Sequence, residues 1–231
     1  MAKARIQTDA ALLVGASPES RLGEAELKRF KQQARQATWI VAVDGGYRWL
    51  KKAGVKPHLY VGDLDSLEGV RLPESLPAIF LPHKKDCSDL QAALAIAAGL
   101  GANRFWAWGV WGGRLDHHWA ALQDLGELAR DRSTHQVRAF APRVQAHWVS
   151  PGRALTLHLS AAERKGSVIS LFAVGGSARG VLTQGLEYAL KSETLGSGSR
   201  GLSNRAIASK ISVSVKSGVV LMTLIHHDPR S

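Results

Sequence analysis

The fold class follows from residues 39–66, which read WIVAVDGGYRWLKKAGVKPHLYVGDLDS. An apolar run at residues 39–43 leads into Asp44 and two glycines, and a second apolar run at residues 59–61 leads into another glycine and two more acids. Residues 47–53 between the runs suit a short helix that stops at a glycine. Strand, helix and strand in this order are typical of a βαβ unit with parallel strands. The stretch therefore predicts an α/β fold.

The same alternation extends to both sides of this stretch. The predicted strands of the first half are residues 11–14, 39–43, 59–61, 78–81 and 105–108. The predicted helices are residues 24–37, 47–53, 89–98 and 115–130, and Ser88 is a natural N-cap for the third. After Pro151 the pattern changes to β-rich runs separated by glycine-rich turns, at residues 154–159, 167–174, 207–215 and 219–225. This half predicts a second, antiparallel all-β domain.

Composition and charge restrict the class of protein. The chain has 231 residues, of which 45% are hydrophobic and 21% charged, and these proportions are ordinary for a folded globular protein. Apolar runs stay below the ~18 residues that span a bilayer, and the start has no long apolar core, so we predict a cytoplasmic location. The single cysteine, Cys87, excludes an intramolecular disulfide and a multi-cysteine zinc site.

A net charge of +11 favours anionic partners, which include nucleotides, nucleic acids and acidic surfaces. The basic residues are spread along the chain without a dense tail or a repeated basic motif. We therefore interpret them as a solvated surface and keep nucleic-acid binding as the alternative from a different functional class.

Aspartates at strand ends are the chemically informative feature. Asp44, Asp63 and Asp65 each come just after a predicted strand, and in open α/β sheets ligands bind at the carboxyl ends of the strands. Asp89 opens a predicted helix and Asp116 follows a Gly-Gly-Arg turn, so both can face the same crevice. Converging carboxylates need a cation, and Mg²⁺ takes oxygen ligands while it keeps waters and substrate phosphates. The pattern predicts a magnesium site that handles a nucleotide.

Two of these acids also have simple structural explanations. Asp44 before two glycines can be a turn former, and Asp89 can be a helix-start charge that the helix dipole favours. Asp63 and Asp65 flank a leucine directly after an apolar strand, which serves no evident folding purpose, so there we favour function. Gly112, Gly113 and Arg114 suit a phosphate, since glycine lets the backbone approach and arginine offers a planar fork. The chain contains no P-loop motif, so ATP must be held in another way.

At these residues the sequence resembles the thiamine pyrophosphokinase family. The resemblance rests on five ordered blocks, which are Val43-Asp44-Gly45-Gly46, Gly62-Asp63-Leu64-Asp65-Ser66, Ser88-Asp89, Gly112-Gly113-Arg114-Leu115-Asp116-His117 and Gly201-Leu202-Ser203-Asn204. It implies an N-terminal α/β catalytic domain, a C-terminal β-sandwich, a homodimer, and transfer of pyrophosphate from ATP to the thiamine hydroxyl with release of AMP. It also implies a site formed between the α/β domain of one subunit and the β domain of its partner.

The resemblance assigns roles to individual residues. The catalytic residues it implies are Asp63, Asp65, Asp89 and Arg114, and the Mg²⁺ ligands are Asp63, Asp65 and Asp89. The ATP-binding residues it implies are Asp44, Gly45, Gly46, Ser88, Gly112, Gly113, Arg114 and Asp116. Ser203 and Asn204 are the implied thiamine contacts. We accordingly predict a Rossmann-like parallel-sheet domain at residues 1–145, which binds ATP and Mg²⁺, and an antiparallel β-sandwich at residues 146–231, which binds thiamine.

Several positions depart from the family pattern. Ser88 replaces the usual threonine, Ala92 stands where a lysine is common, and Arg205 follows Ser-Asn where bacterial relatives usually have glutamate. No tryptophan follows Trp148, so the aromatic wall that some relatives supply from the β domain is expected to be missing. A pyrophosphokinase that acts on a hydroxymethyl pterin therefore stays open as an alternative. A phosphatase that uses Asp63 as a phosphoryl acceptor ranks lower, because Leu67 stands where such motifs usually have threonine or valine.

Overall fold

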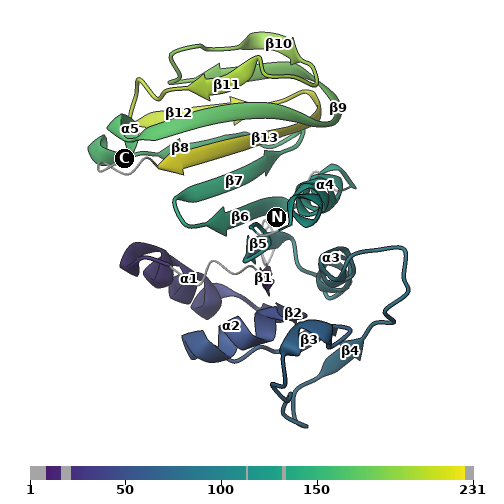
Figure 1. The fold of residues 1–231 in the computed structure, drawn as a ribbon. Helices are drawn as coiled ribbons and strands as arrows, with labels where there is room; N and C mark the ends of the chain where they lie inside the picture. Colours follow the sequence, from purple (N-terminus) through teal and green to yellow (C-terminus); the bar gives the residue numbers. More distant parts are fainter. Residues whose placement is uncertain (1–8, 17–21, 113, 132–133, 227–231) are drawn as a thin grey trace, which may run out of the picture. The chain divides into compact units, whose positions relative to one another are not determined.

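The computed structural model describes residues 9–16, 22–112, 114–131 and 134–226 (Figure 1). These residues form a mixed α/β fold with parallel and antiparallel strands. The chain divides into two compact units, Met1–Leu115 and Asp116–Ser231. Each unit has its own pattern of strand pairing. The domain boundary between residues 145 and 146 stays a prediction.

The first unit is a parallel sheet covered by helices. Its elements are β1 (Ala10–Val14), α1 (Glu24–Gln36), β2 (Trp39–Val43), α2 (Gly46–Ala53), β3 (Leu59–Gly62), the 3₁₀ turn η1 (Asp65–Leu67), β4 (Ala78–Phe80), α3 (Asp89–Gly99) and β5 (Arg104–Trp108). The strand order is β4-β3-β2-β1-β5, and every pair is parallel. In Figure 1, α1 and α2 lie on one side of these strands and α3 on the other. Since β1 and β2 are buried on both faces, they read as continuous apolar runs.

The predicted elements of this half agree with the structure to within about two residues at each end, which is the usual spread of boundary definitions. The Ser88 cap is confirmed, because its hydroxyl accepts a hydrogen bond from Gln91 N–H at 2.9 Å. The order of strands reverses beside β1, which has β2 on one side and β5 on the other. Ligands of open α/β sheets bind at such a reversal, outside the carboxyl ends of the strands.

The second unit is mainly antiparallel. Its elements are α4 (Leu115–Asp131), β6 (Gln136–Ala141), β7 (Val144–Val149), β8 (Leu155–His158), α5 (Ala161–Lys165), β9 (Ser167–Gln184), β10 (Lys191–Leu195), β11 (Gly201–Asn204), β12 (Lys210–Ser214) and β13 (Ser217–His226). The strand order is β6-β7-β13-β9-β12-β8, and β10 and β11 also pair with β9. The sequence pattern missed β6, β7, β10 and β11.

The long strand β9 differs most from its prediction, which ended at residue 174. Gly175 and Gly176 have φ of 64° and 127°, a backbone shape that favours glycine, and the strand continues beyond them. Before this bend β9 pairs with β11 and with most of β13, and after it β9 pairs with β10 and β12, while Arg179 still pairs with Ser217 of β13. The two glycines therefore let one strand take part in two groups of strands, which enclose a core that includes Ile169, Leu171 and Val213.

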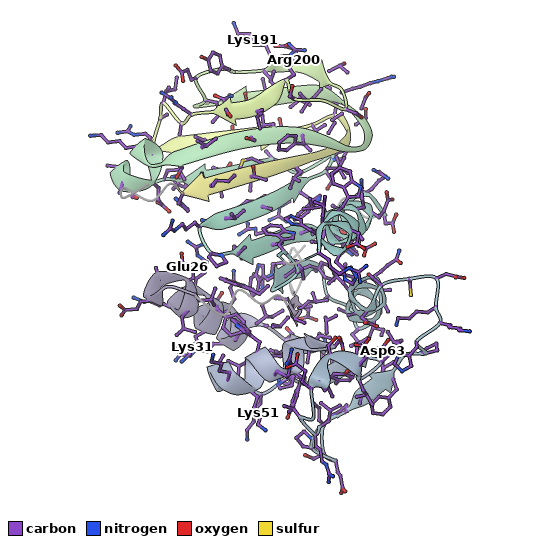
Figure 2. All side chains as sticks on the ribbon, viewed as in Figure 1. Glu26, Lys31, Lys51, Asp63, Lys191 and Arg200 are labelled. Carbon is purple, nitrogen blue, oxygen red and sulfur yellow. The ribbon has the colours of Figure 1, made fainter. Side chains whose placement is uncertain are left out.

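The basic charge is distributed over both units. Lys31 of α1 and Lys51 of α2 are exposed in the first unit, and Lys191 and Arg200 are exposed in the second (Figure 2). This agrees with a solvated basic surface. Among the described residues, no helix is long and apolar enough to cross a membrane.

Candidate active site

The ends of two neighbouring strands bring the first acids together. Asp44 follows β2 and Asp63 follows β3, and these strands pair in parallel with Val43 opposite Val61. Gly62 permits the contact, because a Cβ at this position would lie 2.9 Å from the Cα of Asp44. Asp89 comes from another part of the chain, in the first turn of α3.

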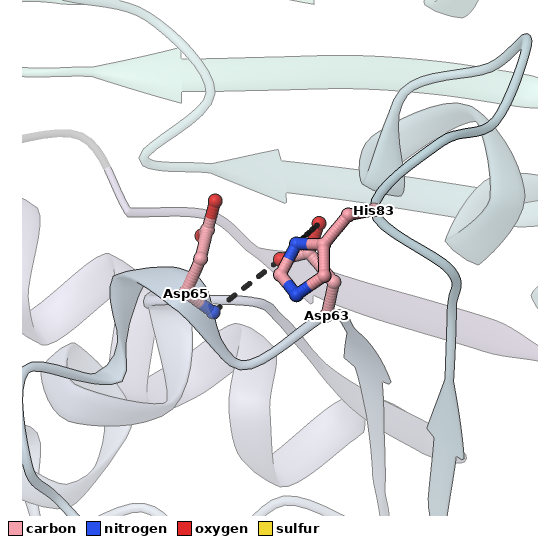
Figure 3. Close-up of side chains that lie close together, drawn as sticks. All are labelled: Asp63, Asp65 and His83. Atoms are coloured by element: carbon pink, nitrogen blue, oxygen red, sulfur yellow. Dashed lines mark hydrogen bonds and ion pairs between the residues drawn. The ribbon is translucent and has the colours of Figure 1, made fainter.

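Two groups of potential metal ligands result. Carboxylate oxygens of Asp44, Asp63 and Asp89 lie within 4.8 Å of one another, and so do ligand atoms of Asp63, Asp65 and His83. Asp63 belongs to both groups, and Figure 3 shows its carboxylate beside the His83 ring and the backbone nitrogen of Asp65. The structure thus places four of the five acids that the sequence singled out in these two groups, and the all-carboxylate group contains Asp44 where Asp65 was expected.

Basic groups hold these carboxylates in place. Lys85 Nζ lies 3.1 Å from Asp63 Oδ2 and 3.1 Å from Asp89 Oδ1, and His83 Nδ1 lies 3.3 Å from Asp63 Oδ2. Asp65 N–H donates to Asp63 Oδ1 at 3.4 Å. Burial raises the pKa of Asp63, but the hydrogen bonds from Lys85 and Asp65 and the nearby positive charges outweigh it, so the pKa lies below its ordinary value.

The pKa of Asp89 is shifted in the opposite direction. Burial raises its pKa and the charges of Asp63 and Asp44 raise it further, while Lys85 only partly offsets them. The resulting pKa lies above the ordinary value of an aspartate. The three acids therefore repel one another in a partly buried place, which is what a cation site requires.

Tyr60 fixes the backbone around the acids. Its buried hydroxyl donates to Asp44 Oδ1 at 3.2 Å and accepts from Leu64 N–H at 3.2 Å. Burial and the charge of Asp44 raise the pKa of Tyr60 far above its ordinary value, so it stays a hydrogen-bond donor. Asp44 and Leu64 have φ of 45° and 73°, a left-handed conformation that is uncommon outside glycine. Such strain tends to occur at functional sites, where surrounding contacts maintain it.

The remaining predicted phosphate residues lie on three segments. Gly45 and Gly46 form the N-cap and the first residue of α2, and Ser88 caps α3. Gly112 has φ of 105° in the turn after β5, Arg114 is an exposed residue just before α4, and Asp116 is in the first turn of that helix. Gly113 lies outside the described residues. Asp116 is not a member of either group of close ligands found among the described residues.

The predicted substrate residues lie beside a pocket in the second unit. The pocket has a volume of about 500 Å³, and its lining includes Glu187, Tyr188, Arg200 and Asn204. Tyr188 lines this pocket and is 68% exposed, so an aromatic side chain other than tryptophan is present there. Ser203 is exposed and has φ of 60°.

Asn204 is buried and uses its amide inside the protein. Its Oδ1 accepts from Tyr188 N–H at 3.0 Å and from Arg205 N–H at 2.8 Å, and its Nδ2 donates to Tyr188 C=O at 2.8 Å. The side chain therefore clamps the backbone on both sides of Tyr188. In this structure Asn204 shapes the pocket by holding that loop.

Comparison of the sequence with known protein families identifies the family to which the chain belongs. Residues 30–137 match the catalytic domain of thiamin pyrophosphokinase, and residues 154–220 match its vitamin B1 binding domain. The chain belongs to the thiamin pyrophosphokinase family. Its enzymatic activity is accordingly that of a thiamine diphosphokinase, a transferase. The two matches cover the aspartate site and the pocket around Tyr188.

Solved structures of the thiamin pyrophosphokinase family have the same fold. The thiamine pyrophosphokinase from Bacillus subtilis is 20% identical with a TM-score of 0.76, and the match covers 95% of this chain and 100% of that one. The enzyme from Geobacillus thermodenitrificans is 24% identical with a TM-score of 0.74, covering 95% and 99%. The yeast enzyme is 15% identical with a TM-score of 0.69, covering 95% and 87%. Comparison with curated proteins gives no match.

Four residues at these sites of the thiamin pyrophosphokinase fold escaped the sequence analysis, namely Tyr60, His83, Lys85 and Tyr188. Tyr60 lies inside an apolar strand, where it reads as core. His83 and Lys85 lie in a loop that carries no periodic signal. One feature of the sequence could have indicated Lys85. It belongs to a short run of basic residues and lies three residues before Ser88, the predicted cap of a helix that begins with an acid.

Replacement of Asn204 by alanine is expected to lower the free energy of unfolding by about 1–3 kcal/mol, because the N–H and C=O of Tyr188 lose their partner. We also expect a higher KM for thiamine with a smaller change in kcat, since the Tyr188 loop loosens. Thermal unfolding and steady-state kinetics measure both effects. Ser203→Ala is the control for stability, because it keeps the backbone hydrogen bond from Ser203 N–H to Ser170 Oγ. A melting temperature equally unaffected by both substitutions would contradict the clamp.

Proposed function

We propose that the aspartate site of the first unit binds Mg²⁺ with ATP and transfers the pyrophosphoryl group of ATP to the hydroxyl of thiamine, releasing AMP. One observation carries the proposal, namely the meeting of Asp44, Asp63 and Asp89 within 4.8 Å from three separate parts of the chain. The family match to thiamin pyrophosphokinase supplies the reaction.

The residues present fit magnesium. Asp44, Asp63 and Asp89 offer only carboxylate oxygens, which are the ligands that Mg²⁺ prefers, and partial burial leaves room for waters and phosphate oxygens. The second group includes the imidazole of His83, which suits transition metals better. We therefore assign Mg²⁺ to the first group. Asp65 lies next to this group, because its N–H donates to Asp63 Oδ1. When bound there, the ion would neutralise charge that develops on the phosphoryl oxygens.

The reaction requires positioning and charge stabilisation more than covalent chemistry by the protein. The hydroxyl oxygen of thiamine bonds to the β-phosphorus of ATP, the bond from that phosphorus to the oxygen of the α-phosphate breaks, and AMP leaves with the electron pair. A carboxylate of the site accepts the hydroxyl proton. Arg114 is the proposed cation on the phosphates, supported by its place directly after the glycine turn and by its planar fork of donors.

The pocket around Tyr188 is the proposed thiamine site. Tyr188 offers an exposed ring to an aromatic heterocycle, and the lining also contains Glu187 and an ion pair between Glu193 and Arg200. Ser203 and Asn204 lie on the same edge of this unit, in β11.

A homodimer and a β-sandwich second domain are part of the proposal. Two groups of strands that share β9 and enclose one apolar core support the sandwich. Cytoplasmic location is likewise proposed from the sequence. Analytical ultracentrifugation measures the oligomeric state directly, and a purely monomeric protein at working concentrations would contradict the dimer.

The proposed reaction predicts a specific product. Purified protein incubated with ATP, Mg²⁺ and thiamine is expected to release AMP and form thiamine diphosphate, and excess EDTA is expected to stop both. Hydroxymethyl pterin in place of thiamine serves as the matched alternative substrate. Release of AMP with the pterin alone would assign a different substrate, and release of ADP in place of AMP would overturn pyrophosphoryl transfer.

A further inference from the structure

Lys85 bridges two acids of the aspartate site. Its ammonium nitrogen lies 3.1 Å from Asp63 Oδ2 and 3.1 Å from Asp89 Oδ1, and it also donates to Pro82 C=O at 3.2 Å. The contacts to Asp63 Oδ2 and Pro82 C=O are hydrogen bonds, and the contact to Asp89 Oδ1 is an ion pair. The side chain is 14% exposed, so little water competes for it. The ammonium is therefore held firmly among the carboxylates.

The positive charge of Lys85 offsets the repulsion among these carboxylates when no metal is bound. Asp44, Asp63 and Asp89 bring like charges within 4.8 Å, and partial burial weakens the screening that water supplies. His83 contacts Asp63 as well, but its side chain is 71% exposed and it makes no ion pair with Asp89 among those found for the described residues. Lys85 is the cation that touches both Asp63 and Asp89.

A divalent ion needs the same oxygens that Lys85 holds. Two cations cannot share these carboxylates at short range without strong repulsion, so a lysine that stays in place would oppose the ion. Lysine has a flexible four-carbon stem and a compact charge, so its ammonium can move to a neighbouring anion at low cost. The anion that accompanies the ion in the proposed reaction is the polyphosphate of ATP.

We propose that Lys85 is a resident counter-cation of the aspartate site, which leaves Asp63 and Asp89 when metal and ATP bind and then contacts the phosphates of ATP. The proposal rests on the proposed function for the identity of the anion. It makes Lys85 weaken the binding of metal to the free protein and strengthen the binding of nucleotide. Metal and nucleotide then bind cooperatively, because each is favoured once the other has arrived.

The competing explanation is purely structural. Lys85 is four residues before Asp89, and its hydrogen bond to Pro82 C=O and its ion pair with Asp89 also tie the loop around Pro82 to the start of α3. A structural tie of this kind predicts lower stability when it is removed, with no gain in metal affinity. The two explanations therefore differ in the sign of the effect on metal binding.

The test measures binding of Mn²⁺, as a spectroscopic substitute for Mg²⁺, in wild type, Lys85→Met and Lys85→Gln. Electron paramagnetic resonance of free Mn²⁺ gives the affinity with and without α,β-methylene-ATP, which cannot transfer pyrophosphate. Without nucleotide, both variants are expected to bind Mn²⁺ at least about 10-fold more tightly than wild type does, because the competing cation is gone. With Mg²⁺ present, their affinity for the analogue is expected to fall about 10-fold, since Lys85 no longer contacts the phosphates.

Lys84→Met is the matched control, because Lys84 is the adjacent lysine and is exposed. It changes the net charge equally and is expected to leave both affinities within about 2-fold of wild type. Unchanged or weaker Mn²⁺ binding by both Lys85 variants, with circular dichroism showing folded protein, would overturn the proposal. So would an equal gain in Lys84→Met, because it would mark a general charge effect.

These measurements distinguish failure of the counter-cation role of Lys85 from failure of the proposed function. A chain that gains Mn²⁺ affinity on loss of Lys85 but makes no AMP from thiamine supports the counter-cation and contradicts the reaction. A chain that makes AMP from thiamine while its Lys85 variants bind Mn²⁺ as wild type does supports the reaction and contradicts the counter-cation.

Discussion

Replacement of Asp63 by asparagine is expected to lower kcat by about 10²–10³-fold, the usual effect of removing one preorganised electrostatic group from a site of charge development. Asp63 is the residue that both groups of close ligands share, and its carboxylate contacts Lys85 and His83. Asparagine keeps the shape but removes the charge and one acceptor oxygen. The site then loses both a metal ligand and the partner that orients Lys85. Steady-state release of AMP at saturating ATP and thiamine measures the change.

The matched control for Asp63→Asn is Asp86→Asn. Asp86 is an exposed acid one residue beyond Lys85, and its replacement changes the net charge of the protein by the same amount. We expect it to keep kcat within about 2-fold of wild type, as surface substitutions away from special features usually have small effects. An Asp63→Asn enzyme that retains more than about a tenth of the wild-type kcat would contradict the assignment of Asp63 to the catalytic centre, given the magnitude expected for such a group.

The first unit was predictable because each of its signals is local. Apolar runs such as residues 39–43 are buried on both faces, and Ser88 caps a helix through its own hydroxyl, so short windows of sequence contain the information. The acids after β2 and β3 were found for a related reason. Parallel strands put their carboxyl ends at one edge, and this rule places Asp44 near Asp63 without any knowledge of side chains.

The second unit was less predictable because its signals are nonlocal. Gly175 and Gly176 read as a turn between strands, whereas the structure uses them as a bend within β9, and only the part after this bend pairs with β10 and β12. Likewise nothing near Asn204 in the sequence shows that its amide clamps Tyr188, which lies 16 residues earlier in the chain. Such contacts depend on which strands pair, and a single sequence does not contain that information.

The role of Gly46 was predicted only in part. The sequence assigned it to ATP binding, which stays a prediction. The structure adds a packing requirement, because a Cβ on Gly46 would lie 1.8 Å from the carbonyl oxygen of Val14, at the end of β1. That oxygen belongs to the backbone of a fully buried strand, so it cannot move aside as the tip of a side chain would.

Gly46→Ala is therefore expected to lower the free energy of unfolding by about 3 kcal/mol or more, at the upper end for overpacking. This corresponds to a fall in Tm of roughly 6–12 °C for a chain of this size. Differential scanning calorimetry without ligands measures the stability effect apart from any loss of ATP binding. Gly99→Ala is the control, since a Cβ at this helical position meets nothing within 4 Å and alanine favours the helix. If both variants have the Tm of the wild type, the packing requirement at Gly46 is contradicted. The glycine at position 46 must then be explained by nucleotide binding alone.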